Sequence, residues 1–272
     1  MSFNALQFSN TFLKHSKTKI MKKLLLLFSL AIPMLLCAQT KAPKKNKLTV
    51  ITLHPLQNET ENFEKGLALH NKTFHSGDAA IDIYQVLVGD RTGEFHFVYR
   101  NLSTWAEVEK GFNAVEAKDH STDWETNVGK YLNDKTARYF YEQSDDSYMS
   151  PNMADMNTAL LGIYFIELNN GMEDDFNAGL KKIKEMYKKA NSKNYYQIMS
   201  RSFGSNSQVA VVFPLPDGWA SFEPKPDDDW SKLFKVAFPK EDFKLFIKKF
   251  NATQKSFESL VVKHRADLSS PN

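Results

Sequence analysis

Histidine is the residue type of this chain whose positions most directly suggest chemistry. His70 lies on an apolar helical stripe with Phe63, Leu67 and Phe74, at spacings of four, three and four residues. A histidine on a core-facing stripe needs hydrogen-bond partners or a ligand, because burying an unpaired polar group costs free energy. His70 is therefore a candidate ligand-binding residue, and a hydrogen-bonded structural histidine is the alternative.

His96 alternates with Phe95 and Phe97 in a predicted strand, so its side chain points away from the face that the two phenylalanines share. It would project either into a barrel or towards solvent, and it is a second candidate ligand-binding residue. The chain has no HExxH motif, no histidine pair four residues apart on a helix and no carboxylate cluster at ligand spacing. The sequence therefore predicts no metal site, and the catalytic residues remain unknown.

Trp105 and Trp219 occupy matching places, each at or near the first helical turn after a predicted strand. Glu109 and Glu223 follow four residues later, on the same face if the segment is helical. The two indoles either line pocket mouths or wedge a helix against the end of the sheet. Both tryptophans are candidate ligand-binding residues, although their presence in both halves favours the structural interpretation.

The elements that position these residues occur twice, about 113 residues apart. Residues 95–109 align without a gap on 209–223, and residues 62–74 align on 175–187. The matched glycines, Gly66 and Gly179, predict a close approach of a helix backbone to a strand. Both halves need the fold but seldom both need the site, so function is expected where the copies differ. The foremost such difference is the position that holds His70 in the first copy and Ile183 in the second.

Each half has the predicted element order βαββαβ. The first half has strands at 48–53, 81–88, 94–99 and 137–142, and helices at 59–75 and 103–132, with an interruption near 119–122. The second half has strands at 160–168, 195–201, 208–213 and 260–264, and helices at 173–190 and 229–256, with a break near Pro239. The predicted domains are an extension with signal peptide (1–38), a disordered tether (39–46), a first repeat (47–142), a linker (143–157), a second repeat (158–267) and a tail (268–272).

The N-terminal region has the layout of a bacterial signal peptide. Basic residues at 21–23 precede an apolar run at 24–36, which is shorter than the roughly 20 residues of a membrane-spanning helix. Cleavage near Ala38 would release a periplasmic or secreted protein without a transmembrane segment. Lipid attachment at Cys37 is disfavoured, because Leu36 precedes it where a small residue is expected.

Removal of this region changes the charge and the cysteine content. The first 38 residues hold five lysines and no acidic residue, so 30 basic residues face 32 acidic ones in the mature chain. This balance does not support a nucleic-acid partner. Cys37 is the only cysteine, and the mature chain therefore has no disulfide and no thiolate metal ligand.

Two βαββαβ units in tandem resemble the dimeric α+β-barrel superfamily of ferredoxin-like domains. That superfamily includes small antibiotic-biosynthesis monooxygenases, haem-degrading enzymes, chlorite dismutases and NIPSNAP-type proteins. The resemblance covers roughly residues 47–267 and rests on element order and the duplication. It implies an α+β fold of two tandem ferredoxin-like repeats with antiparallel sheets, which form a pseudo-dimeric barrel within one chain. In haem-binding members a helix above the sheet supplies the iron-ligating histidine, so the resemblance permits haem with His70 as its ligand.

These observations leave three functions open. A non-catalytic periplasmic or secreted protein that binds a small apolar or aromatic molecule is favoured by the 13% aromatic residues, the signal peptide and the absence of a catalytic constellation. A haem-binding or monooxygenase-type enzyme is the alternative that the resemblance permits. A structural or interaction module of the cell envelope is the third. Fold alone does not choose among them, and the cofactor is unknown.

Overall fold

The computed structural model describes residues 46–99, 104–113, 118–203, 208–225 and 229–271. All of the described residues lie in one compact unit, Lys45–Asn272. The predicted signal peptide, Cys37 and nearly all of the predicted tether lie outside them. Within the described ranges, no helix combines the length and the apolar character that crossing a bilayer requires.

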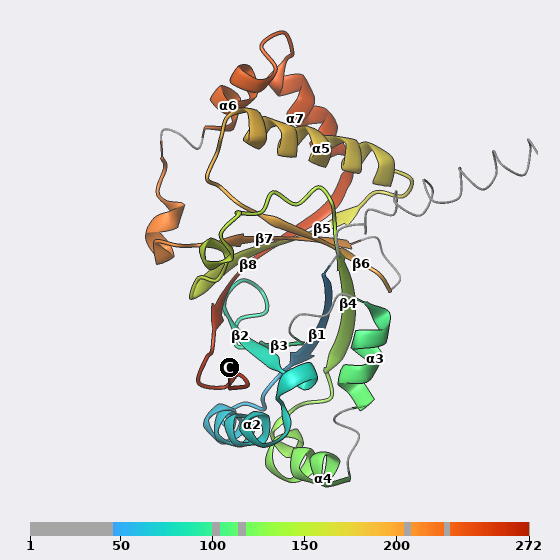
Figure 1. Ribbon diagram of the computed structural model, residues 1–272, viewed down its shortest axis with the longest axis vertical. Coiled ribbons are helices and arrows are strands. Elements are labelled where there is room, and N and C mark those ends of the chain that lie inside the picture. Colours follow the sequence, from blue (N-terminus) through green and yellow to red (C-terminus); the bar gives the residue numbers. More distant parts are fainter. Residues whose placement is uncertain (1–45, 100–103, 114–117, 204–207, 226–228, 272) are drawn as a thin grey trace, which may run out of the picture. The chain divides into compact units, whose positions relative to one another are not determined.

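Eight antiparallel strands close into a barrel, which confirms an α+β fold (Figure 1). Around the barrel the order is β1-β3-β2-β8-β5-β7-β6-β4. The two halves of the chain meet where β2 pairs with β8 and where β4 pairs with β6. The strands are β1 (Lys47–Leu53), β2 (Ile81–Val88), β3 (Phe95–Tyr99), β4 (Ala137–Gln143), β5 (Leu160–Leu168), β6 (Gln197–Arg201), β7 (Gln208–Pro214) and β8 (Gln254–His264).

Helices lie outside the barrel, with α2 and α4 at one end of the view and α5, α6 and α7 at the other (Figure 1). The α-helices are α2 (Thr60–Phe74), α3 (Trp105–Asn113), α4 (Lys118–Asn127), α5 (Glu173–Lys189), α6 (Trp230–Ala237) and α7 (Phe243–Ala252). Four short 3-10 helices are η1 (Gly77–Ala79), η2 (Gly129–Tyr131), η3 (Met153–Met156) and η4 (Gly218–Phe222).

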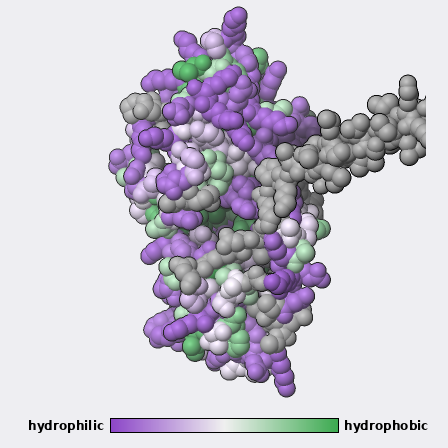
Figure 2. Space-filling model, viewed as in Figure 1, coloured by the Kyte–Doolittle hydropathy of each residue, from purple (hydrophilic) through white to green (hydrophobic). Residues whose placement is uncertain are grey.

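Three buried clusters follow from the alternation of side chains along the strands. In β3, Phe95 and Phe97 face α2 and α4 in one core, while Val98 packs into a second core inside the barrel. His96 shares the face of Val98, so it projects into the barrel interior and not towards solvent. The third core lies between the second half of the sheet and α5–α7. Outside these cores, hydrophilic residues dominate the face in Figure 2.

The two matched glycines mark close helix–helix contacts, whereas the sequence predicted helix–strand contacts. A Cβ atom at Gly66 would lie 1.8 Å from the carbonyl oxygen of Asn127, at the end of α4. A Cβ atom at Gly179 would lie 2.3 Å from the ring of Phe250 in α7. Each glycine therefore lets a second helix cross close to the helix that covers the sheet.

Several predicted boundaries differ from the structure. The interruption expected near 119–122 is wrong, since α4 runs through those residues. The helix expected over 229–256 ends at Ala252, and β8 begins at Gln254 because its alternating residues extend the pairing with β5. The linker residue Tyr148 pairs with Tyr196, and Leu268 in the predicted tail is only 3% exposed. Linker and tail both pack against the barrel domain.

Candidate metal centre

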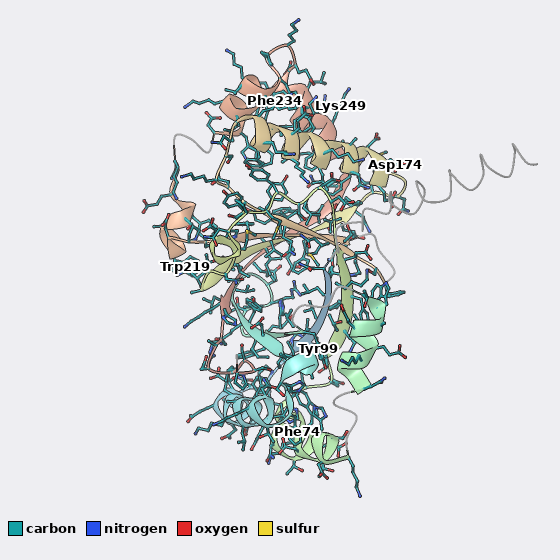
Figure 3. All side chains as sticks on the ribbon, viewed as in Figure 1. Phe74, Tyr99, Asp174, Trp219, Phe234 and Lys249 are labelled. Atoms are coloured by element: carbon teal, nitrogen blue, oxygen red, sulfur yellow. The ribbon has the colours of Figure 1, made fainter. Side chains whose placement is uncertain are left out.

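Three histidines from separate segments of the first half bring their ring nitrogens together. His70 lies in the last turns of α2, His75 directly follows that helix, and His120 lies in the first turn of α4. The Nε2 atom of His120 is 3.1 Å from Nε2 of His70 and 3.4 Å from Nε2 of His75. One ligand atom from each ring lies within 4.8 Å of the other two. Phe74, which contacts the rings of His70 and His120, is labelled in Figure 3 between α2 and α4.

The end of α2 explains how His70 and His75 can face the same point. Residues five apart on a continuous helix point about 140° away from each other. Here the helix ends at Phe74, and His75 adopts an extended backbone while its N–H donates to the carbonyl of Asn71. This turn of the chain brings the His75 ring back towards His70. His70 is fully buried and His75 is 2% exposed, whereas His120 is partly exposed.

The outer nitrogens of two of the rings are held by acceptors. Nδ1 of His70 donates to Oδ2 of Asp123 at 2.7 Å, and Nδ1 of His75 donates to the carbonyl oxygen of Ala79 at 3.0 Å. A carbonyl oxygen can only accept, and an ionised carboxylate can only accept as well. The proton of each neutral ring therefore sits on Nδ1. Nε2 of His70 and Nε2 of His75 consequently present lone pairs to His120.

His120 cannot satisfy both lone pairs by hydrogen bonding. A neutral imidazole carries one N–H, so Nε2 of His120 can donate to only one of the two facing nitrogens at a time. If its proton is on Nδ1, three lone pairs converge on one point. A cation at that point would remove the repulsion, and a bound metal is how proteins commonly use converging neutral imidazoles.

The pKa values of the cluster keep these rings neutral. Burial lowers the pKa of His75 to about 4, with the bond to Ala79 opposing and the neighbouring His70 and His120 adding to the shift. Burial also lowers the pKa of His70, although Asp123 pulls it upward, and burial together with His70 lowers the pKa of His120. Burial would raise the pKa of Asp123, but hydrogen bonds from His70 and Asn127 outweigh it and the pKa is lowered.

Two of the three nitrogen separations match those around a small tetrahedral ion. Zinc binds histidine nitrogen at about 2.0–2.1 Å, which places the nitrogens of a tetrahedral site about 3.3–3.4 Å apart. The two Nε2 separations of 3.1 and 3.4 Å lie close to that value. Asp123 and Ala79 hold two of the ligand rings from behind, which is the usual arrangement around metal-binding histidines.

Aromatic side chains form the walls of the cluster. The ring of Trp124 lies 5.1 Å from that of His70, and the ring of Phe97 lies 5.1 Å from that of His75. Phe74 lies 5.1 Å from His70 and 5.4 Å from His120. These walls exclude solvent from two of the three histidines, and they strengthen electrostatic interactions at the cluster.

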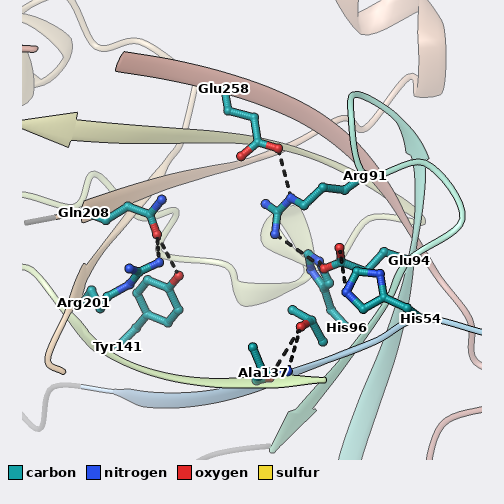
Figure 4. A network of polar contacts seen from close by, with 10 residues as sticks. His54, Arg91, Glu94, His96, Ala137, Tyr141, Arg201, Gln208 and Glu258 are labelled. Atoms are coloured by element: carbon teal, nitrogen blue, oxygen red, sulfur yellow. Dashed lines mark hydrogen bonds and ion pairs between the residues drawn. The ribbon is translucent and has the colours of Figure 1, made fainter. Parts of the chain in front are cut away.

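His96 belongs to a different polar network inside the barrel (Figure 4). Its Nε2 atom lies 2.9 Å from Oε1 of Glu94, which is 3% exposed. Arg91 and His54 approach the same carboxylate at 3.4 and 3.5 Å, and Arg91 also binds Glu258 at 3.0 Å. A buried carboxylate surrounded by these groups is a self-neutralised network, and His96 is therefore separate from the histidine cluster.

Trp105 and Trp219 lie on the surface and not together. Trp105 is 39% exposed and packs against Phe140 and Phe203, with the Lys47 ammonium 4.8 Å above its ring. Trp219 is 52% exposed on η4, where the ring of Phe222 lies 6.1 Å away. Figure 3 shows Trp219 far from the labelled Phe74 beside the cluster. Neither indole contributes to the histidine cluster.

The second half carries a mostly apolar cavity, whose lining also includes the charged residues Asp155, Lys193, Glu223, Lys225 and Asp229. Its volume is about 1170 Å³, and it lies between the sheet and the second-half helices. Ile183, the counterpart of His70, is among its lining residues. Other members of the lining are Tyr164, Leu180, Tyr187, Phe213 and Phe257.

The sequence does not reveal His75 and His120 as partners of His70, because local spacing compares residues within single helices. The position of His75 near the end of a predicted helix suggests a solvated side chain, which is wrong because the structure leaves it only 2% exposed, and no motif singles out His120. The unequal distribution of histidines between the two halves could have indicated the cluster. The second half has only His264, whereas the first half has five of the seven, at positions 54, 70, 75, 96 and 120. The expectation of no metal site rests on the absence of local sequence motifs. Ligands that come from two helices and a helix end form no local motif, so this absence does not bear on them.

Comparison of the sequence with protein families and with curated proteins finds no match. Solved structures do match at low identity. A protein from Lactobacillus acidophilus NCFM, provisionally described as a monooxygenase, has 13% identity, a TM-score of 0.47 and coverage of 82% of this chain and 95% of its own. Chlorite dismutase from Candidatus Nitrospira defluvii has 8% identity, a TM-score of 0.47 and coverage of 81% and 91%. An anthrone oxidase-like protein has 8% identity, a TM-score of 0.45 and coverage of 82% and 92%.

Proposed function

We propose that this protein binds a divalent transition metal, of the zinc class, through Nε2 of His70, His75 and His120. One observation carries the proposal: three Nε2 atoms converge while hydrogen bonds occupy Nδ1 of two of the rings. Imidazole nitrogen suits zinc, copper, iron and nickel, and availability and geometry choose among them. The buried, neutral rings are already in the protonation state that binds a metal.

The cluster supports an ion better than it supports haem. His70 is the expected haem ligand, but its Nε2 atom faces Nε2 of His120 at only 3.1 Å, and Asp123 holds its Nδ1 atom. The rings of His120, Phe74 and Trp124 lie 4.6, 5.1 and 5.1 Å from that of His70. A porphyrin would have to displace these packed rings, whereas an ion fits between the nitrogens.

Metal content separates this proposal from a purely structural histidine cluster. Protein freed of metal and then dialysed against Zn²⁺ should hold about one zinc per chain, and His120→Ala should hold none at the same free zinc concentration. His120 is partly exposed, so the substitution should leave the fold intact. His264→Gln, which changes a histidine outside the cluster, is the control and should bind as the unaltered protein does. Equal zinc in His120→Ala and the unaltered protein would rule out the centre.

A second function is favoured by the cavity of the second half. We propose that it binds the small apolar or aromatic molecule expected from the sequence, because its volume of about 1170 Å³ is lined by tyrosine, phenylalanine and aliphatic side chains. A concave and mostly apolar space of this kind is typical of small-molecule sites. The half-exposed Phe257 lines the cavity, so Phe257→Ala should weaken binding of the fluorophore ANS. Phe203→Ala removes an exposed ring outside the cavity lining, and it should leave ANS binding unchanged. An equal loss of ANS binding in both variants would argue against binding in the cavity.

We also propose that each half is a ferredoxin-like repeat and that the chain is a built-in pseudo-dimer. The support is the shared strand order, β4-β1-β3-β2 in the first half and β8-β5-β7-β6 in the second. In both halves helices cover the outer face of these strands. The two halves would then have kept one architecture and diverged in the layer between helices and sheet.

A further inference from the structure

The number of protein ligands at the proposed metal centre is three. Among the residues that the structure describes, the candidate set of converging histidine, cysteine and carboxylate atoms contains only His70, His75 and His120. Zinc in proteins takes four ligands in structural sites, whereas centres with three protein ligands keep the fourth position for water or a substrate. The three-histidine set therefore has the composition of an open centre.

Asp123, the nearest carboxylate, is occupied by hydrogen bonds to other side chains. Its Oδ2 atom accepts from Nδ1 of His70 at 2.7 Å, and its Oδ1 atom accepts from Nδ2 of Asn127 at 2.6 Å. Both oxygens are thus engaged on the outer side of the His70 ring. Asp123 orients a ligand and does not supply the fourth one.

His120 is the histidine of the proposed metal centre that solvent and small ligands can reach. His70 is fully buried and His75 nearly so, while His120 is partly exposed on α4. The helix α4 has no buried residue among those described. A ligand can therefore reach the metal beside His120, while the ring of Phe97 in β3 covers His75 and the ring of Trp124 in α4 covers His70.

Charge determines what kind of ligand this position would favour. Three neutral imidazoles leave the full 2+ charge on the metal, and Asp123 is the carboxylate that compensates part of it. The remaining positive charge lies against aromatic walls of low polarity, where an opposite charge is attracted more strongly than in water. A small anion, or water that loses a proton on the metal, would lower the net charge of the centre.

We infer that the centre has an exchangeable fourth position that takes water and small monovalent anions, which makes it an open centre able to present a ligand for reaction. This inference rests on the proposed metal binding. The ligand class is set by charge and by the narrow space between packed rings: small anions that coordinate through one atom, such as azide, thiocyanate or formate. Bulky organic ligands are not expected at this position.

Cobalt absorption tests the inference on the full chain. Co²⁺ replaces zinc in histidine sites, and its visible bands are intense in tetrahedral sites and weak in octahedral ones. The metal-free protein with one equivalent of Co²⁺ should develop intense bands, which His120→Ala should lose and His264→Gln should keep. Sodium azide should then shift these bands in a saturable way, while sodium perchlorate, which coordinates weakly, should leave them unchanged at equal ionic strength.

The possible outcomes distinguish the two claims. If no intense bands develop with cobalt, metal binding at the three histidines is wrong. If intense bands develop but azide leaves them unchanged at saturating concentration, the metal proposal stands and the exchangeable position is wrong. Equal shifts with azide and perchlorate would also overturn it, because the effect would then come from ionic strength and not from coordination.

Discussion

At the scale of the residue, hydrogen bonds to Nδ1 are what turn buried histidines into ligands. The large majority of buried side-chain polar atoms have a hydrogen-bond partner. His70 and His75 are each satisfied on Nδ1 by an acceptor, which leaves Nε2 as an acceptor aimed at another histidine. The chemistry therefore depends on Asp123 and on the carbonyl of Ala79 as much as on the imidazoles.

Substitution of Asp123 tests this dependence. In Asp123→Asn the amide can no longer accept as strongly from Nδ1 of His70, so the preferred tautomer and the basicity of the ligand nitrogen are lost. Loss of such an outer partner typically costs about 10–100-fold in metal affinity. Zinc titration by calorimetry should show that loss, with Asp119→Asn, an exposed substitution on the same helix, as the control. An unchanged affinity in Asp123→Asn would contradict the assigned role.

The carboxylate of Glu94 inside the barrel is held by His96, Arg91 and His54. Burial would raise its pKa, but the hydrogen bond from His96 and the charges of His96, Arg91 and His54 outweigh burial and lower it. A carboxylate whose pKa is lower in the folded than in the unfolded protein adds stability above the unfolded pKa. That stability is lost as the pH falls through the folded pKa.

Glu94→Gln should therefore destabilise the protein at neutral pH and much less in acid. The expected loss in the free energy of unfolding at pH 7 is about 1–3 kcal/mol, as for a buried polar group that loses its charged partner. The difference from the unaltered protein should shrink as the pH falls below the ordinary glutamate pKa. Denaturant unfolding at several pH values measures it, with the exposed Glu109→Gln as control. A pH-independent difference would contradict a lowered pKa of Glu94 in the folded protein.

At the scale of the element, α4 is held by a few specific contacts. It has no buried residue among those described, and it meets α2 through His120, Asp123, the ring of Trp124 and the carbonyl of Asn127 that lies against Gly66. The sequence does not predict this packing, because the polar residues of α4 lack a clear apolar stripe. The strands and α2, with their strong periodicity, are predicted within one residue of their observed ends except where β6 and β8 differ.

Gly66→Ala tests the coupling of α4 to the metal centre. A Cβ atom at 1.8 Å from the carbonyl oxygen of Asn127 forces α4 outward, and His120 moves with it. Metal affinity should fall, and stability should decrease by about 1–3 kcal/mol from overpacking. Gly179→Ala creates a comparable clash with Phe250 in the second half and should destabilise the protein without changing metal affinity. Equal zinc affinity in Gly66→Ala and Gly179→Ala would argue against the coupling.

At the scale of the whole molecule, the α+β organisation can be predicted from the sequence, whereas the histidine cluster cannot. The periodic strands and helices of both halves make the antiparallel α+β organisation accessible from the sequence. The histidine cluster cannot be predicted from the sequence, because His75 and His120 are 45 residues apart and meet only through the docking of α4 on α2. The difference between His70 and Ile183 is visible in the sequence, and a functional role for it stays a prediction. Export to the periplasm or beyond stays a prediction of the sequence.

Anomalous diffraction at the zinc edge tests the central claim most directly. Crystals of the zinc-loaded protein should show one strong anomalous peak, about 2.0–2.1 Å from Nε2 of each of His70, His75 and His120. His120→Ala crystals grown with the same zinc should lack it. A zinc-loaded crystal with no anomalous peak between these three nitrogens, or with zinc bound only elsewhere on the chain, would contradict the metal centre.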